Sequence, residues 1–480
     1  MNENLESHKK LGTKEILTYA FGIFGVQLFI GAINTYQSQF YTSMFGADLM
    51  AVAVIILVAK ILSSLADPLI GNLIDRSNFK MGKMRPFILI SAFPITILTT
   101  IMFIVIPFKT QVGMYAYITV TTILWNISMS FADIPSQGML ALLTPKAEER
   151  NSAAGITNIL KSVALAAPSV VVPVICILTK SANGAIGSKE YLISALVYVA
   201  VGLPLYLLIP FCNKEAVPVV HNRMTLKDLV KELKDNRMLF IVFLTYMLGF
   251  GRSMGMNIGV QAGAVLLKDG VTLPILGYMA GENLAWLLGV TSAVSSTISI
   301  ILAPAINKKW GEKKTFIWFA VYGTAVCLAA FILYVTGVSA LRTLLAILIY
   351  QIFVGFAFGP IGYLPMVMVS DIVDYREWQT GKRTEGTQFA VLSLSNKINN
   401  ALCVAIGIFI VGAAGYNAEK VAEGLITITP GMQNWVFFAY MGIPGISMLL
   451  SMLPMFWYKI NKDVKIKMYA DLAERRGQQI

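Results

Sequence analysis

An apolar run that begins near Met50 and is long enough to cross a membrane carries two charged side chains. On a helix, Lys60, Ser63 and Asp67 fall at i, i+3 and i+7, within one stripe about 60° wide. Burying one ion at membrane depth costs at least ~2.5 kcal/mol, so this stripe must face a partner or water. We expect it to line a polar path through a helical bundle; the alternative is a structural Lys–Asp pair that joins two helices.

A second carboxylate lies deep in a later apolar run, LWNISMSFADIPSQG. Asn126, Ser130 and Asp133 follow one another at i, i+4 and i+7, and Pro135 frees a backbone carbonyl by removing its helical donor. A carboxylate beside a hydroxyl and a free carbonyl is an oxygen-rich arrangement of the kind that binds cations. The pattern therefore predicts a site for a cation or for substrate hydroxyls.

Basic side chains also lie within apolar runs, where ionisable groups are rare and usually functional. The six deep ionisable residues are Lys60, Lys161, Arg252, Lys397, Asp67 and Asp133. Lys397 is followed by asparagines in mid-span, which packing alone does not explain. Lys161 and Arg252 could instead lie nearer a membrane interface, and a lysine at a helix end can extend its side chain outward. Of the six residues, four are positive and two are negative.

The elements that must position these residues follow from the composition. The chain has 480 residues, of which 56% are hydrophobic and 13% charged, so it is far more apolar than a soluble domain. Its apolar runs, each of about 20 to 30 residues, are long enough for a ~30 Å hydrocarbon core. We expect an all-α membrane protein with twelve transmembrane helices. The predicted spans are 15–43, 48–74, 86–108, 113–143, 152–178, 190–212, 238–267, 283–306, 315–336, 341–370, 386–415 and 433–458.

Basic residues are distributed unevenly between the connecting segments. With both termini on one side, the segments on that side hold 28 of the 38 Lys and Arg residues, and the opposite segments hold six. The positive-inside rule then predicts a cytoplasmic (inner) membrane protein with both termini in the cytoplasm. The net charge of +12 follows from this topology, so no nucleic-acid partner is expected. Residues 1–14 lack the apolar region of a signal peptide.

One long basic connection separates the first six spans from the last six. Within it Leu226, Leu229, Val230 and Leu233 recur at helical spacing, which predicts a short amphipathic helix on the membrane face. The expected parts are an N-terminal tail (1–14), a six-helix bundle (15–212), a linker with the amphipathic helix (213–237), a second six-helix bundle (238–458) and a C-terminal tail (459–480).

Opposite charges are dense in the segment MVSDIVDYREWQTGKRTEG at 368–386. Such charges can pair in one state of a transport cycle and separate in another, so we expect a gate here; a static salt-bridge cluster is the alternative. Four predicted gating residues lie in this segment, namely Asp371, Asp374, Arg383 and Glu385. Three more, Asp75, Arg76 and Arg85, lie in the loop between the second and third predicted spans.

Four motifs, in order along the chain, carry a family resemblance. They are DPLIGNLIDRSNFKMGKMRPFIL, the DIP of the fourth span, SDIVDYREWQTGKRTEGTQFA and KINNALCVAIGIFIVGAAGY. With these motifs the chain resembles the glycoside-pentoside-hexuronide:cation symporters of the melibiose permease type, over essentially all twelve spans. The resemblance implies a major facilitator fold of two six-helix bundles, alternating access, and sugar uptake coupled to Na⁺, Li⁺ or H⁺.

The resemblance also implies roles for single residues. Asp67 resembles a cation-site carboxylate, Asp133 a residue close to both cation and sugar, and Lys397 a lysine on the conductance path. The chain departs from the family pattern at Ser63 and Ala66, which replace an aspartate and an asparagine. Because losing a charged oxygen ligand weakens a Na⁺ site, these departures favour proton coupling through Asp67 or Asp133 over Na⁺ coupling.

Further departures concern sugar recognition. Gln27 replaces an aspartate of the family pattern, and Gln137 replaces a tryptophan. Asn158 replaces an arginine, and Lys161 follows it one helical turn later. The expected substrate-binding residues are Gln27, Asp133, Gln137, Asn158, Lys161, Arg252 and Lys397. The expected cation-coupling residues are Lys60, Ser63, Asp67, Ser130 and Asp133, with Asp67 and Asp133 as the carboxylates for Na⁺ or H⁺. No structural metal and no cofactor are expected.

We therefore expect a secondary active symporter, with a monomeric functional unit in the lipid bilayer, that imports a glycoside or sugar together with H⁺ or Na⁺. Because the six deep charges are four positive and two negative, a carboxylate-bearing sugar such as a hexuronide or glucuronide is electrostatically reasonable. A transporter of the same fold for a lipid-like or other organic anion substrate is the alternative. An intramembrane enzyme or a receptor is less well supported. The chain has no HExxH or GxxxxGK[ST] motif, and His8 and His221 lie outside the spans.

Overall fold

The chain folds into two compact units that are almost entirely helical. The computed structural model describes residues 12–77, 79–143, 147–179, 186–215, 226–273, 277–381 and 385–475. Unit 1 consists of Met1–Arg223, Asp269–Trp286 and Asn417–Thr427, and unit 2 of Met224–Lys268, Leu287–Tyr416 and Ile428–Ile480. Among the predicted gating residues, Arg383 and the side chains of Asp75 and Glu385 lie outside the described part of the chain.

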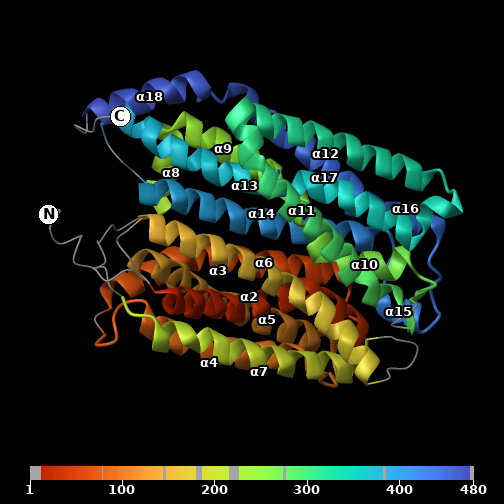
Figure 1. Cartoon of the computed structure of the whole chain (residues 1–480). Coiled ribbons are helices and arrows are strands. Elements are labelled where there is room, and N and C mark those ends of the chain that lie inside the picture. Colours follow the sequence, from red (N-terminus) through yellow and green to blue (C-terminus); the bar gives the residue numbers. More distant parts are fainter. Residues whose placement is uncertain are drawn as a thin grey trace. The chain divides into compact units, whose positions relative to one another are not determined.

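Six long helices run side by side in unit 1 (Figure 1). They are α2 (Thr13–Met44), α3 (Leu49–Arg76), α4 (Arg85–Met102), α5 (Gln111–Leu143), α6 (Ala147–Leu178) and α7 (Ser188–Cys212). Helix α2 packs along α6 and α7, α3 packs on α5, and α4 packs on both α5 and α7. Because α2 also contacts α3, α4 and α5, it is the central helix of the unit.

Glycines allow α2 to approach its neighbours closely. A Cβ atom at Gly25 would lie 2.5 Å from the carbonyl oxygen of Gly202 and 2.6 Å from the backbone nitrogen of Tyr206, both on α7. At Gly31 a Cβ would lie 2.7 Å from the carbonyl oxygen of Leu165 on α6. Small residues at such positions are what lets helix backbones touch inside a membrane. The position of α2, and of every polar residue on it, therefore depends on these contacts.

Unit 2 contains more interrupted helices. Its main elements are α8 (Leu226–Asp235), α9 (Arg237–Leu248), η2 (Phe250–Ser253), α10 (Met254–Leu266), α11 (Ala285–Trp310, whose first turn clusters with unit 1), α12 (Glu312–Val335), η4 (Ser339–Arg342), α13 (Leu344–Thr380), α14 (Glu385–Ala413), α16 (Pro430–Phe437), the π-helical η5 (Phe438–Gly442), α17 (Ile443–Met452), η6 (Pro454–Trp457) and α18 (Lys462–Arg475). Helix α12 packs on α13 and α17, and α14 packs on α9 and α10.

Ten of the described helical segments are long and apolar enough to cross a membrane. Helix α5, with 33 residues, and the interrupted α9–η2–α10 complete the twelve predicted segments. Helices suit this setting because they satisfy their own backbone hydrogen bonds where no water is available. Large apolar side chains on their outer faces, such as Leu69 at 71% exposure, suit contact with lipid. The predicted all-α architecture is confirmed.

Two segments from the second half of the sequence belong to unit 1. A hairpin of β1 (Val271–Leu273) and β2 (Gly277–Met279) leads into η3 (Gly281–Leu284). There the carboxylate of Glu282 accepts hydrogen bonds from Nε2 of Gln39 on α2, at 3.3 Å, and from the backbone nitrogen of Ile186, at 2.9 Å. The second segment contains α15 (Ala418–Ala422), which also packs on α2. Both segments are therefore attached near the C-terminal end of that helix.

The C-terminal segment is a helix attached to unit 2 rather than a loose tail. Helix α18 packs against α13, as Figure 1 also shows. Nζ of Lys465 lies 2.5 Å from Oδ2 of Asp371 and 2.7 Å from Oε2 of Glu312. The hydroxyl of Tyr469 donates to Oδ1 of Asp371 at 3.2 Å. Burial, with Asp371 nearby, raises the pKa of Tyr469, so this hydroxyl keeps its proton at neutral pH.

We expect Lys465→Met to release α18 from α13. The methionine fills a similar volume but leaves two carboxylates, Asp371 and Glu312, close together without their shared cation. Amide hydrogen exchange in 462–475 should become at least ~10-fold faster, as expected for local opening. Lys462→Met, at an exposed position of the same helix, is the control and should leave exchange unchanged. Equal exchange in both variants would show that the ion pairs do not hold α18.

Candidate functional site

The polar stripe predicted on the second span lies on α3 and is connected to α2. Nζ of the half-buried Lys60 donates to Oδ1 of Asn34 on α2 at 3.3 Å. Ser63, only 7% exposed, donates its hydroxyl to the carbonyl oxygen of Lys60 at 3.1 Å. The hydroxyl oxygen of Ser63 keeps its lone pairs, so it remains able to bind a cation.

Asp67 and Asp133 lie on two packed helices of unit 1, α3 and α5. Their neighbours in sequence, Ala66 and Ile134, pack against one apolar cluster of Ile70, Ile74 and Phe87, as do Met84 and Phe131. Both carboxylates are half-buried. Oδ2 of Asp133 accepts a hydrogen bond from Nε2 of Gln137, one turn further along α5, at 2.7 Å. Each of the two predicted acids thus follows or precedes, in sequence, a residue that packs on the same cluster.

Further polar residues of α2 and α5 are buried in unit 1. Gln27 is 3% exposed, and Gln37, at 5%, donates from Nε2 to the hydroxyl of Thr122 on α5 at 2.9 Å. Ser130 is 4% exposed and lies between Asn126 and Asp133 on α5. Helix α5 continues through Pro135, as the predicted span requires. Helices α2 and α5 therefore bury amides and hydroxyls inside unit 1, and one pair of them joins the two helices.

Two predicted substrate residues, Asn158 and Lys161, lie on α6. The side chain of Asn158 is exposed and that of Lys161 is half-buried. Within the described part of unit 1, neither side chain makes a hydrogen bond or an ion pair; only the backbone carbonyl of Asn158 accepts, from Ser162, at 3.0 Å. The structure does not join these two residues to Asp67 or Asp133.

In unit 2 the predicted seventh span, 238–267, is not a continuous helix. It is interrupted by the 3-10 segment η2, between α9 and α10. Ser447 of α17 stabilises the break: its hydroxyl donates to the carbonyl oxygen of Leu248 at 2.7 Å and accepts from the backbone nitrogen of Gly251 at 2.8 Å. The predicted span is therefore interrupted at η2, where a hydroxyl from a distant helix satisfies backbone groups that the break frees.

Arg252 lies in this break, and Tyr246 holds its side chain. The Cζ atom of Arg252 lies 4.2 Å from the centre of the Tyr246 ring, and Nη2 donates to the Tyr246 hydroxyl. That hydroxyl donates in turn to Oδ1 of Asn396 on α14. Nδ2 of the buried Asn399 donates to the backbone carbonyl of Tyr246 at 2.7 Å. Arg252 is thus tied through Tyr246 to the asparagines of α14.

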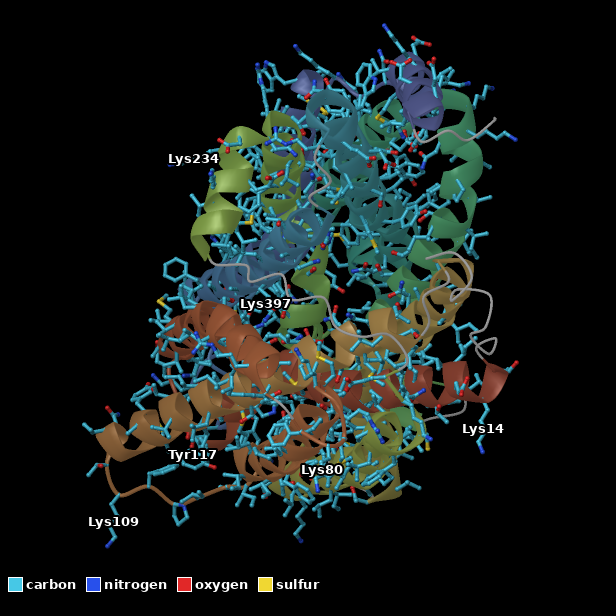
Figure 2. The ribbon with its side chains drawn as sticks, turned by 90° about the vertical axis from the view of Figure 1, so that its left-hand side faces the viewer. Lys14, Lys80, Lys109, Tyr117, Lys234 and Lys397 are labelled. Atoms are coloured by element: carbon cyan, nitrogen blue, oxygen red, sulfur yellow. The ribbon has the colours of Figure 1, made fainter. Side chains whose placement is uncertain are left out.

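Lys397, which Figure 2 labels, lies on α14. By sequence it falls in the same helical turn as Asn396 and Asn399. Its side chain is half-buried. Unit 2 therefore places two of the predicted substrate residues, Arg252 and Lys397, on elements that pack against each other, since α14 contacts both α9 and η2.

Two of the predicted gating residues, Arg85 and Asp371, have partners within their own units. Arg85 of unit 1 donates from Nε to the carbonyl oxygen of Pro210 at 2.8 Å and from Nη1 to that of Met81 at 3.2 Å, while Arg76 is exposed. Asp371 of unit 2 pairs with Lys465, and Asp374 is half-buried. No local pattern in the sequence connects Lys465 with Asp371.

Glu215 is another residue that the sequence analysis did not identify. Its carboxylate accepts hydrogen bonds from the backbone nitrogens of Lys83, Met84 and Arg85, at 2.9, 2.8 and 3.2 Å. These donors lie at the N-terminal end of α4, where helices leave backbone N–H groups free and attract negative charge. Glu215 thus ties the segment after α7 to the start of α4.

Comparisons with known proteins agree with this architecture. The model of a family described as "MFS/sugar transport protein" matches residues 18–462. A putative sulfoquinovose importer of Salmonella typhimurium is 26% identical over 98% of this chain and 95% of its own. An isoprimeverose transporter of Lactiplantibacillus pentosus is 24% identical over 97% and 92% of the two chains. A glucuronide carrier protein homologue of Escherichia coli is 24% identical over 96% and 95%.

Solved structures support the same fold. A bacterial homologue of the human lysosomal transporter Spinster superposes with a TM-score of 0.66 at 10% identity, over 97% of this chain and 99% of its own. The predicted major facilitator fold, and the prediction of a transporter rather than an enzyme, are confirmed. With a match that spans nearly the whole length, the chain belongs to the MFS/sugar transport protein family.

Proposed function

We propose that this protein is a symporter of an inner membrane that imports a sugar or glycoside together with H⁺ or Na⁺ by alternating access. One observation supports the coupling: half-buried Asp67 and Asp133 lie on packed helices α3 and α5, each next in sequence to a residue that packs on the same apolar cluster. Carboxylates in such a place are the usual sites for coupling ions. The names of the relatives, which refer to isoprimeverose, sulfoquinovose and glucuronide, support a sugar substrate.

The proposed topology follows the distribution of basic residues. Both termini are cytoplasmic, with bundles at 15–212 and 238–458 joined by the linker 213–237, and the functional unit is a monomer. In that arrangement the helix ends that carry Arg85, on α4, and Asp371, on α13, face the cytoplasm. The gate consists of charged residues at those ends, namely Asp75, Arg76, Arg85, Asp371, Asp374, Arg383 and Glu385.

In the proposed mechanism, the coupling ion binds to Asp67 and Asp133. The hydroxyl oxygens of Ser63 and Ser130 are neutral ligands, and Lys60, whose Nζ donates to Oδ1 of Asn34, offsets the negative charge of Asp67 while the ion is absent. The sugar hydrogen-bonds to residues of both bundles: Gln27, Asp133, Gln137, Asn158, Lys161, Arg252 and Lys397. Coupling arises because the two ligands together change the relative stability of the inward-open and outward-open states.

Thermal stability of the purified protein tests this proposal. The panel contains neutral and acidic glycosides, each measured with and without Na⁺ at two pH values, because a ligand that binds the folded state raises its stability. We expect stabilisation by at least one sugar, which increases with Na⁺ or with falling pH according to the coupling ion. The same sugar should accumulate in vesicles only when that ion gradient is imposed. No stabilisation by any sugar, together with no uptake, would refute the proposal.

A further inference from the structure

Arg252 carries a positive charge in mid-span, and its partner is a tyrosine rather than an acid. Among the described residues, its side chain makes a hydrogen bond and a ring contact only with Tyr246, and no carboxylate lies within 4.0 Å of it. A guanidinium keeps its proton under all ordinary conditions. An unbalanced arginine at membrane depth is costly and is usually kept for function.

The surrounding sequence supplies no acid either. The segment 237–268, which contains α9, η2 and α10, has no Asp or Glu, and the same is true of 386–413 on α14. The second segment adds another cation, Lys397, one residue after Asn396. This part of unit 2 is therefore positive on both of the packed elements that form it.

The guanidinium of Arg252 is held in a fixed orientation. Stacking on Tyr246 sets the plane of the group, and the bond from Nη2 to the Tyr246 hydroxyl sets its rotation. Tyr246 is itself fixed at both ends, by Asn396 at its hydroxyl and by Asn399 at its backbone carbonyl. One bond to Tyr246 leaves four of the five guanidinium N–H donors for a ligand.

A glycine lies beside the guanidinium. A Cβ atom at Gly362 of α13 would lie 3.8 Å from Nη1 of Arg252 and 4.0 Å from Nε. A methyl group there would just make contact, and a larger side chain would crowd the guanidinium. A flat fork of donors suits a group with two oxygens in one plane.

We propose that Arg252, positioned by Tyr246 and Asn396, binds an acidic group of the transported sugar, a carboxylate or a sulfonate. The inference rests on the proposed sugar transport and adds the charge of the substrate to it. Two parallel N–H···O bonds to one acidic group balance the arginine and explain why the protein keeps it in the span. A neutral sugar leaves the charge unbalanced and binds more weakly, since buried donors without partners penalise the wrong ligand.

Binding to the purified full-length protein tests the proposal. The probes are a hexuronate, a sugar of the same stereochemistry with a sulfonate, and the matching neutral hexose. We expect the wild type to bind at least one acidic probe about 100-fold more tightly than the neutral one. Arg252→Met should remove this preference, lowering acidic-sugar affinity about 100-fold while leaving neutral-sugar affinity within a few-fold.

Two further variants separate recognition from folding. Arg252→Lys keeps the charge but loses the fork, so it should recover only part of the preference for the acidic probe. Tyr246→Phe keeps the ring and removes the hydroxyl that positions the guanidinium, and should weaken acidic-sugar binding about 10-fold. Lys268→Met removes one exposed positive charge just beyond α10 and is the control for net charge; it should bind as the wild type does.

The outcomes distinguish this inference from the proposed function. If the wild type binds acidic and neutral sugars equally, or if Arg252→Met weakens both to the same extent, Arg252 does not recognise an acid and the inference fails, while sugar transport stands. If no sugar of either charge binds the wild type, the proposed function itself fails. A preference for the carboxylate over the sulfonate probe, or the reverse, identifies the acidic group.

Discussion

Replacing Asp67 with asparagine is expected to abolish cation-driven accumulation of sugar. Asparagine has nearly the same volume, but it neither binds a proton in the working pH range nor offers a charged oxygen to Na⁺. With the coupling site gone, an ion gradient no longer favours one state of the carrier over the other. Uptake against a gradient in membrane vesicles should fall at least ~10-fold, while exchange of sugar down its own gradient continues.

Comparison of uphill and downhill transport distinguishes this role from a structural one. If Asp67 only joined two helices, Asp67→Asn would lower thermal stability and reduce both kinds of transport together. Asp269→Asn, at an exposed position between α10 and β1, is the matched control and should leave both unchanged. Undiminished accumulation in Asp67→Asn would refute the coupling role.

The helices of this protein were predictable because hydrocarbon allows few alternatives. Every backbone group must be satisfied within its own segment, so apolar length alone locates the spans. The spacing of Lys60 and Asp67 predicts that their stripe faces the interior, and the bond from Lys60 to Asn34 agrees with this. The charged residues, which cost the most free energy to bury at membrane depth, were thus the easiest to identify.

Features that depend on distant partners were not predictable. The glycines around η2 are visible in the sequence, but the break there is stabilised by the hydroxyl of Ser447, almost 200 residues later. Lys465 has no local pattern that indicates its partner Asp371. The same is true of Glu282, whose bonds to Gln39 and Ile186 attach a hairpin to unit 1. Tertiary contacts of this kind leave no periodicity in the chain.

Gly25→Leu is expected to leave little folded protein, and even Gly25→Ala should be strongly destabilising. Its Cβ would lie 2.5 Å and 2.6 Å from two backbone atoms of α7, which cannot move aside as a side chain can. We expect Gly25→Ala to lose roughly 2–3 kcal/mol of stability, as overpacking of a well-packed interior does. The loss should appear as a lower midpoint of thermal unfolding in detergent.

The sign of the change in stability of Gly25→Ala shows whether packing or helix propensity determines it. Alanine is the better helix former by ~1 kcal/mol, so propensity alone would make Gly25→Ala stabilising. Gly155 of α6 provides the matched control, because a Cβ there meets nothing within 4 Å, and Gly155→Ala should be neutral or stabilising. If both variants stabilise, α2 and α7 do not pack through Gly25. If only Gly25→Ala destabilises, the close approach of α2 to α7 positions Gln27, Asn34 and the rest of the polar face of α2, because those side chains are fixed only as firmly as the helix that carries them.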